Sequence, residues 1–290
     1  MIPAHMLTIA AVVCLASACT NRGTVADSPL PRGAPVEATT ALPADASTAT
    51  VRLNASSRHG EWVMVRTGSA DSVKAWVVYP ERSTKAPVVI VVHEIFGLSP
   101  WIRSVADQLA ADGFIAIAPD FVTTKNLPEG TDSASTQAIV AAVRTLDPAQ
   151  VQRQIDAVAQ YGMSLPSALR KYGVVGFCWG GAVSFAHAVH TPNLGASVVY
   201  YGTSPRPELL GSVRAPVLGL YGSNDARVNA TIPAADSAMR AMGKTYVQHI
   251  YPGAGHGFLR QQPGMEGANM AATRAAWPAT IAWFRNYLGA

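Results

Sequence analysis

The chain has 290 residues, of which 49% are hydrophobic and 14% are charged, so it can form one large globular domain or two small ones. Its formal net charge is +4, and its Lys and Arg residues are scattered along the sequence rather than clustered. These features exclude the concentrated basic surface of a nucleic-acid-binding protein, and we expect no nucleic-acid partner.

Residues 1–19 form an apolar N-terminal segment without Asp, Glu, Lys or Arg. The apolar run is shorter than the roughly 20 residues that span a bilayer. It ends in Ala16-Ser17-Ala18 before Cys19, which is typical of a signal-peptide cleavage site. The segment also resembles the box before the lipidated cysteine of bacterial lipoproteins, although Leu15 stands one position too early and no basic residue precedes the run. We expect an exported protein, periplasmic or membrane-anchored through a lipid on Cys19; the alternative is a true start at Met6 or later.

Residues 20–56 are rich in Ala, Thr, Pro and Ser and contain no aromatic residue, so they cannot bury enough apolar surface to fold alone. We expect a flexible linker there and a single folded domain over 57–290. Without the leader, the domain keeps one cysteine, Cys178. This excludes an intradomain disulfide and a cluster of thiolate metal ligands, and we expect neither a metal nor a cofactor.

From residue 62 onward, short β-branched runs alternate with helical patterns. The strand candidates are Trp62–Arg66, Val73–Tyr79, Val88–His93, Phe114–Ala118, Val174–Phe177, Ser197–Tyr201, Val217–Tyr221 and Tyr246–Tyr251. Helices are expected at 101–112, after Asp147-Pro148, after Gly181, at 233–242 and at 270–288. This alternation predicts an α/β fold with one mostly parallel, eight-stranded sheet and helices on both faces.

Cys178 stands where one of these strands gives way to a helix. The stretch Gly176-Phe177-Cys178-Trp179-Gly180 has the form of a nucleophile elbow, with cysteine in place of serine. Glycines are needed two residues to either side because the chain reverses sharply there, and side chains would collide. The helix N-terminus beneath the sulfur favours a thiolate.

Two later loops supply a matching acid and base. Asp225 ends the strand-loop LGLYGSND, and His256 lies in the glycine-rich turn after the last strand. The chain order Cys178, Asp225, His256 is that of α/β-hydrolases, in which the histidine takes the proton of the nucleophile and the aspartate orients it. Taken singly, Asp225 could be a turn residue and His256 an ordinary loop histidine. The ordered set of three favours the catalytic interpretation.

Five motifs together resemble the dienelactone hydrolase family, also called carboxymethylenebutenolidases: HEIFG at 93–97, APD at 118–120, GFCWGG at 176–181, YGSND at 221–225 and GHGF at 255–258. The resemblance covers nearly the whole of the expected domain. It implies an α/β-hydrolase fold without a separate cap domain. It also implies a hydrolase that cleaves small ester or lactone substrates through a thioester acyl-enzyme.

The resemblance also assigns roles to four further residues. Glu94 would contact the resting cysteine and be displaced by substrate; the alternative is a structural salt bridge to a nearby arginine. The backbone N–H groups of Ile95 and Trp179 would form the oxyanion hole. Arg260 matches a position that binds a substrate carboxylate, although a solvated loop arginine would look the same. His93-Glu94 is not a zinc motif, because no second histidine follows at the required spacing.

One departure from the family pattern concerns the substrate. Other members carry a second carboxylate-binding arginine shortly after the APD motif, where this chain has Thr123, Thr124 and Lys125, so a dienelactone need not be the substrate. We expect the segment 121–146 to border the pocket. The alternatives are a promiscuous carboxylesterase or acyl-peptide hydrolase, a non-catalytic ligand-binding lipoprotein, and a redox-sensing thiol protein. A monomer is expected.

Overall fold

The computed structural model describes Met1 and residues 41–68, 71–125, 127 and 133–289. The predicted signal peptide, the lipidation site at Cys19 and most of the predicted linker lie outside the described residues and stay predictions. Among the helices that are described, none combines the length and the apolar character needed to cross a membrane.

A single sheet organises the described domain. Its strands are β1 (Gly60–Arg66), β2 (Ser72–Val78), β3 (Ala86–Val92), β4 (Ile115–Asp120), β5 (Ala168–Phe177), β6 (Ala196–Tyr200), β7 (Val217–Gly222) and β8 (Tyr246–Tyr251). Their spatial order is β1-β2-β4-β3-β5-β6-β7-β8. β2 pairs antiparallel with β1 and β4, and every other neighbouring pair is parallel. The predicted α/β fold is therefore confirmed.

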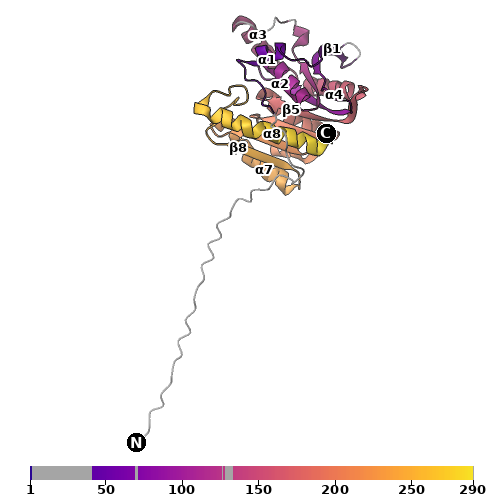
Figure 1. Cartoon of the computed structure of the whole chain (residues 1–290). Helices are drawn as coiled ribbons and strands as arrows, with labels where there is room; N and C mark the ends of the chain where they lie inside the picture. Colours follow the sequence, from indigo (N-terminus) through magenta and orange to yellow (C-terminus); the bar gives the residue numbers. More distant parts are fainter. Residues whose placement is uncertain (2–40, 69–70, 126, 128–132, 290) are drawn as a thin grey trace. The chain divides into compact units, whose positions relative to one another are not determined.

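Helices cover both faces of this sheet (Figure 1). They are α1 (Ala49–Asn54), α2 (Pro100–Ala111), α3 (Ser133–Arg144), α4 (Pro148–Ser164), α5 (Trp179–His190), α6 (Ala226–Asn229), α7 (Ile232–Ala241) and α8 (Ala268–Leu288), with short 3₁₀ turns at Thr123–Lys125, Pro207–Ser212 and Met265–Gly267. Residues of α1, α2 and α8 share one buried cluster, whereas residues of α4, α5 and α7 share the other. All seven residues of β3 are buried, as expected for a strand covered on both sides.

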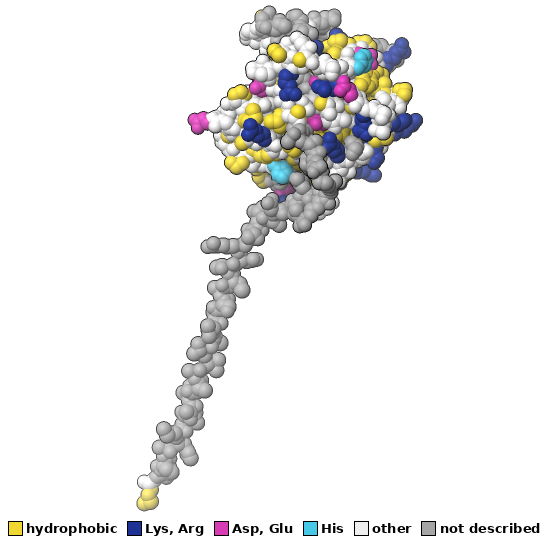
Figure 2. All heavy atoms as spheres, in the orientation of Figure 1, with side chains coloured by type: hydrophobic (Ala, Val, Ile, Leu, Met, Phe, Trp, Pro, Cys, Tyr) yellow, Lys and Arg dark blue, Asp and Glu magenta, His cyan; other side chains and the backbone are white. Residues whose placement is uncertain are grey.

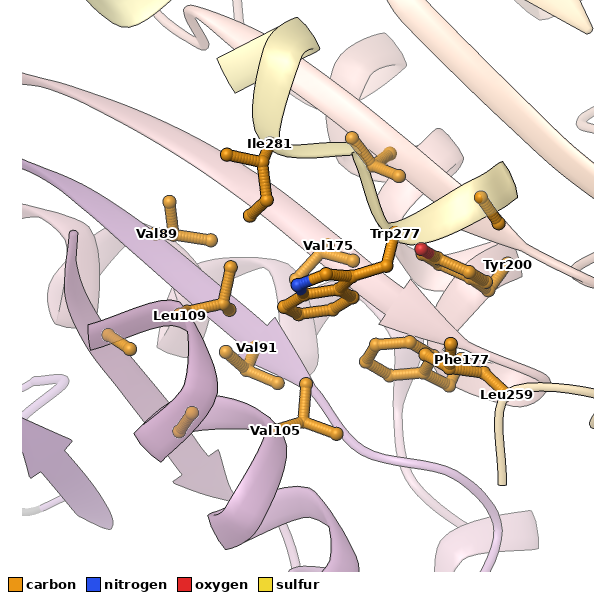
Figure 3. Packing of buried hydrophobic residues seen from close by; sticks show 14 of the residues in the cluster. Val89, Val91, Val105, Leu109, Val175, Phe177, Tyr200, Leu259, Trp277 and Ile281 are labelled. Carbon is orange, nitrogen blue, oxygen red and sulfur yellow. The ribbon is translucent and has the colours of Figure 1, made fainter. Parts of the chain in front are cut away.

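The core beneath α2 and α8 supports the strand that leads to Cys178. The indole of Trp277 on α8 packs among side chains of β3, β5 and α2, and Phe177 lies in the same layer (Figure 3). Trp277 has no exposed surface, and its Nε1–H donates to Asp112 Oδ2 at 3.0 Å. The end of β5 is thus packed tightly just before the candidate nucleophile.

The prediction of a flexible linker up to residue 56 is wrong for residues 41–56. These residues lie against the domain and include α1, with Ala44 4% and Ala49 1% exposed. Composition did not reveal this because the segment is held mainly through backbone carbonyls, two small alanines and one partly buried leucine, Leu42. The folded unit therefore includes residues 41–56 as well as the predicted domain.

In the described part of the segment 121–146, the structure shows a helix, α3, that sequence patterns did not indicate. Its buried side chains are Ser135, Ile139 and Val143, and Ile139 and Val143 form a small separate cluster with Val122.

On the face shown in Figure 2, Lys and Arg side chains are interspersed with acidic and apolar ones.

Candidate active site

The candidate site lies where parallel strands end at one edge of the sheet. Glu94 follows β3, Cys178 follows β5, Asp225 follows β7 and His256 follows β8. Because β3, β5, β6, β7 and β8 run parallel, their carboxyl ends meet at this edge, which is where active sites form in such sheets.

Cys178 occupies a strained turn between β5 and α5. Its φ of 56° and ψ of −113° lie outside the regions that non-glycine residues favour, and such conformations cost about 1–3 kcal/mol. The turn is fixed on both sides, because Cys178 N–H donates to Tyr200 O at 3.1 Å and Cys178 O accepts from Ala182 N at 3.2 Å. A strained residue held in this way is a frequent feature of functional sites.

The glycines of the elbow are required by close backbone contacts. A Cβ at Gly176 would lie 1.8 Å from Gly180 O, and one at Gly180 would lie 2.4 Å from Val92 O. Any side chain at these positions would therefore move the backbone that holds Cys178. This confirms the predicted reason for the glycine pattern.

His256 and Asp225 form a close pair. His256 Nδ1 lies 2.5 Å from Asp225 Oδ2. Asp225 is 7% exposed and its Oδ1 also accepts from Val228 N at 3.4 Å, as the N-cap of α6. An ionised carboxylate only accepts hydrogen bonds, so Nδ1 carries the proton and Nε2 is left as an acceptor.

Glu94 and Arg260 form an ion pair at the same edge. Arg260 Nε is 3.3 Å from Glu94 Oε2, with side-chain exposures of 29% and 5%. Burial raises the pKa of Glu94 to about 7, and the charge of Arg260 opposes this rise. The predicted alternative of a salt bridge between Glu94 and a nearby arginine is therefore seen, and its partner is the predicted substrate-binding arginine.

The thiol of Cys178 is protonated in this arrangement. Burial first, and the charge of Glu94 second, raise the pKa of Cys178 to about 11, whereas the N–H of Trp179 lowers it. Within the described residues, no hydrogen bond links Cys178 Sγ to His256. The N-terminus of α5 thus lowers the pKa of the thiol, as predicted, but burial and the charge of Glu94 raise it by more.

Ile95 and Trp179, whose N–H groups are predicted to form the oxyanion hole, lie in the loop after β3 and at the start of α5. Trp179 is the first residue of α5, so its N–H has no acceptor within the helix. Ile95 lies in the loop that joins β3 to α2, a loop closed by Gly97 N–H donating to Glu94 O at 3.2 Å. Both N–H groups belong to segments adjacent to Cys178 and Glu94.

A cavity of about 430 Å³ opens beside Arg260. Phe96, Asp120, Thr123 and Lys74 are among its lining residues, and among the described residues Cys178 and His256 do not line it. Arg260 links the cavity to the candidate site, because its guanidinium contacts Glu94 and lies 4.7 Å from the ring centre of Phe96.

Two residues near the site belong to none of the sequence motifs and were not predicted. Tyr201, directly after β6, is fully buried with a φ of 40°, and its ring centre lies 5.1 Å from that of His256. The sequence could have indicated Tyr201, because it directly follows a central strand of the sheet. Lys74 lines the cavity from β2, with Nζ 4.1 Å from the ring centre of Trp62; nothing in the sequence indicates this reach.

No group of three or more His, Cys, Asp or Glu side chains suited to a metal occurs in the part of the chain that the structure describes.

The comparisons with known proteins agree with one another. The model of the dienelactone hydrolase family matches residues 73–288. A "Putative carboxymethylenebutenolidase" of Salmonella typhimurium is 32% identical over 233 residues, covering 76% of this chain and 84% of that protein. A "Probable 2-oxo-3-(5-oxofuran-2-ylidene)propanoate lactonase" of Bradyrhizobium sp. is 30% identical over 242 residues, covering 79% and 94%.

Solved structures show the same fold. The crystal structure titled "Putative Dienelactone Hydrolase" from Klebsiella pneumoniae superposes with a TM-score of 0.68 at 29% identity, covering 80% of this chain and all of that one. The family match spans most of the chain and includes all the site residues described above. The chain therefore belongs to the dienelactone hydrolase family and is a hydrolase.

Proposed function

We propose that the protein is a cysteine-dependent hydrolase of carboxylic esters or lactones, with Cys178 as nucleophile, His256 as general base and Asp225 as the residue that orients His256. The observation that carries the proposal is the 2.5 Å pairing of His256 Nδ1 with Asp225 Oδ2, at the edge where the strained turn presents Cys178. A ligand-binding protein or a redox-sensing thiol needs no such pair.

The reaction has two halves. His256 Nε2 takes the thiol proton while Cys178 Sγ attacks the carbonyl carbon, and the N–H groups of Ile95 and Trp179 bind the oxyanion. The imidazolium returns the proton to the departing oxygen, the C–O bond breaks and a thioester remains. Water, deprotonated by His256, then attacks the thioester, which releases the acid and restores the thiol. In a lactone, the departing oxygen stays within the same molecule.

Glu94 controls the charge state of Cys178 in this proposal. Burial, and after it the ionised carboxylate of Glu94, raises the pKa of the thiol, so the free enzyme holds an unreactive thiol. A substrate that engages Arg260 competes with the Glu94–Arg260 ion pair and displaces Glu94. The thiolate then forms only beside bound substrate, which protects a lone thiol from oxidation.

The substrates we favour carry an acidic group. Arg260 and Lys74 both line the cavity, and a guanidinium binds a carboxylate through two parallel hydrogen bonds. A lactone is a suitable form of such a substrate, since a relative that is 30% identical is named as a lactonase. A promiscuous carboxylesterase or an acyl-peptide hydrolase acting through the same three residues is the alternative.

The direct test uses the purified protein with a short aryl ester and with a dienelactone. We expect hydrolysis of at least one of them, together with a mass increase on the peptide that contains Cys178 when a slowly turned-over ester is used. Inertness toward both substrates would refute the proposal. Hydrolysis of the aryl ester alone would favour the carboxylesterase alternative.

Replacing Arg260 by methionine is expected to remove selectivity for acidic substrates. Charge-assisted hydrogen bonds contribute about 1.5–3 kcal/mol, so the ratio of kcat/KM for an acid-bearing aryl ester to that for its methyl-ester analogue should fall about 10- to 100-fold. Arg240→Met is the matched control, because Arg240 is an exposed arginine paired with Asp236. An unchanged ratio in Arg260→Met would show that Arg260 does not bind the substrate.

Replacing Glu94 by glutamine is expected to make Cys178 more reactive above neutral pH. Because the pKa of Glu94 is about 7, the wild-type carboxyl is neutral at pH 5.5 and charged at pH 8.5, where it raises the pKa of Cys178. Glutamine removes that charge, so alkylation of Cys178 by iodoacetamide at pH 8.5 should be about 3- to 10-fold faster, with little difference at pH 5.5. Mass spectrometry of the Cys178 peptide measures both rates.

The control for this change is Glu208→Gln, which removes an exposed carboxylate and should leave the profile unchanged. If Glu94→Gln reacts as the wild type does at both pH values, Glu94 does not control the charge state of the thiol.

A further inference from the structure

Residues 41–56, hereafter the N-terminal strap, lie outside the region matched by the family model, which begins at residue 73. The strap nevertheless packs on the domain, because Ala44 and Ala49 are buried in the core cluster of α2 and α8. Its contacts fall on one segment that carries part of the candidate site and on a second that directly follows another part.

The first segment is the loop between β8 and α8, which carries His256 and Arg260. Ala46 N–H donates to Arg260 O at 2.9 Å. Gln262 is 5% exposed, and its Nε2 donates to Pro43 O at 2.9 Å and to Leu259 O at 3.1 Å. The strap therefore bonds to the backbone of Arg260 itself and to the side chain of Gln262.

The second segment is α2, which follows the loop of Glu94. Trp101 Nε1–H donates to Ala44 O at 3.0 Å, and Arg52 links Leu42 O to Gln108 Oε1 with distances of 2.7 and 3.0 Å. The ring of Trp101 packs edge-on against Phe177, with centres 5.2 Å apart, and Phe177 directly precedes Cys178. The strap thus contacts both the loop that carries Arg260 and the helix that follows the loop of Glu94.

The strap is one of several supports of this loop, because Gly255 N–H also donates to Asn269 Oδ1 at 2.9 Å and Phe258 and Leu259 have no exposed surface. Residues 252–264 form turns without regular helix or strand, and Gly253 and Gly257 both have positive φ. Segments of this kind open locally more easily than strands do. The ion pair of Arg260 with Glu94 depends on where the backbone of Arg260 lies, and the strap bonds to that backbone and to the helix that follows the loop of Glu94.

We propose that the N-terminal strap is a positioning element of the active site, which sets the place of Arg260 relative to Glu94 and to the substrate. The inference rests on the proposed function, because we expect the position of Arg260 to determine selectivity for acidic substrates. A strap that only stabilised the fold would leave that selectivity unchanged.

The test detaches the strap in the full-length protein. Ala49→Glu places a carboxylate where the side chain is 1% exposed, which is unfavourable enough to displace α1 from α2. Val51→Glu is the matched control, because it makes the same charge change in the same helix at a residue that is 72% exposed. The readout is the ratio of kcat/KM for an acid-bearing aryl ester to that for its methyl-ester analogue. An inactive fraction lowers both terms equally and leaves the ratio unchanged.

We expect the ratio to fall at least 5-fold in Ala49→Glu and to keep its wild-type value in Val51→Glu. Amide hydrogen exchange provides a readout that needs no substrate. In Ala49→Glu, exchange should accelerate in the peptide 257–264 as well as in the strap. Gln262→Leu, which breaks the bond to Pro43 from the side of the loop, should show both effects if Ala49→Glu does not fold.

The inference is overturned if the strap exchanges rapidly in Ala49→Glu while the peptide 257–264 and the ratio stay as in the wild type. Failure of the proposed function looks different. In that case the wild type hydrolyses neither ester, and the exchange of peptide 257–264 alone decides whether the strap positions the loop.

Discussion

Replacing Cys178 by alanine is expected to lower kcat/KM for ester hydrolysis by about 10⁴-fold or more, to the level supported by binding and the oxyanion hole alone. The physical reason is that no other thiol lies in the described domain, and neither Asp225 nor His256 can form the acyl-enzyme in its place. The measurement is hydrolysis of a short aryl ester by both proteins at equal concentration.

The fold of this variant should be unaffected. Alanine is smaller than cysteine, and Sγ forms no hydrogen bond to His256 that would be lost among the described residues. The thermal midpoint therefore serves as the control, and it should change by only a few degrees. If more than a tenth of the activity remains, the thiol is not the nucleophile and the proposed mechanism fails.

The location of the site at one edge of the sheet could be predicted because its residues directly follow recognisable strands. β5, β7 and β8 are short β-rich runs followed by glycine-rich turns, and the topology of a parallel sheet brings their carboxyl ends together without further information. The strain at Cys178 was also predictable. Glycines at both 176 and 180 indicate that other backbone atoms approach these positions too closely for a side chain.

Which arginine pairs with Glu94, and what the side chain of Lys74 reaches, could not be predicted, because both depend on distances between segments far apart in the chain. Glu94 and Arg260 are 166 positions apart in sequence, and Lys74 reaches the cavity from an antiparallel strand at the other end of the sheet order. Side-chain reach across a twisted sheet leaves no periodic signal. The N-terminal strap escaped notice for a related reason, since backbone carbonyls accept hydrogen bonds whatever the side chain.

Replacing Asp225 by asparagine is expected to lower kcat/KM about 10⁴-fold while preserving the fold. Asparagine is also a good N-cap residue, so the bond from Val228 N can be kept. Its side-chain NH₂ group, however, can face Nδ1 of His256, which then accepts a hydrogen bond and loses its proton. The proton moves to Nε2, so that nitrogen can no longer take the thiol proton of Cys178. Steady-state hydrolysis of the aryl ester measures the loss.

The chain offers a matched control in a second histidine–aspartate pair. His190 Nε2 lies 2.8 Å from Asp156 Oδ2, at the end of α5 that is about 18 Å from Cys178 for a 12-residue helix. Asp156→Asn should leave kcat/KM within about twofold of the wild type. If Asp225→Asn is no more impaired than Asp156→Asn, the pairing at 2.5 Å serves only to hold the loop, and His256 does not act as a general base. If only Asp225→Asn loses activity and its thermal midpoint is retained, the carboxylate of Asp225 acts by fixing the tautomer of His256.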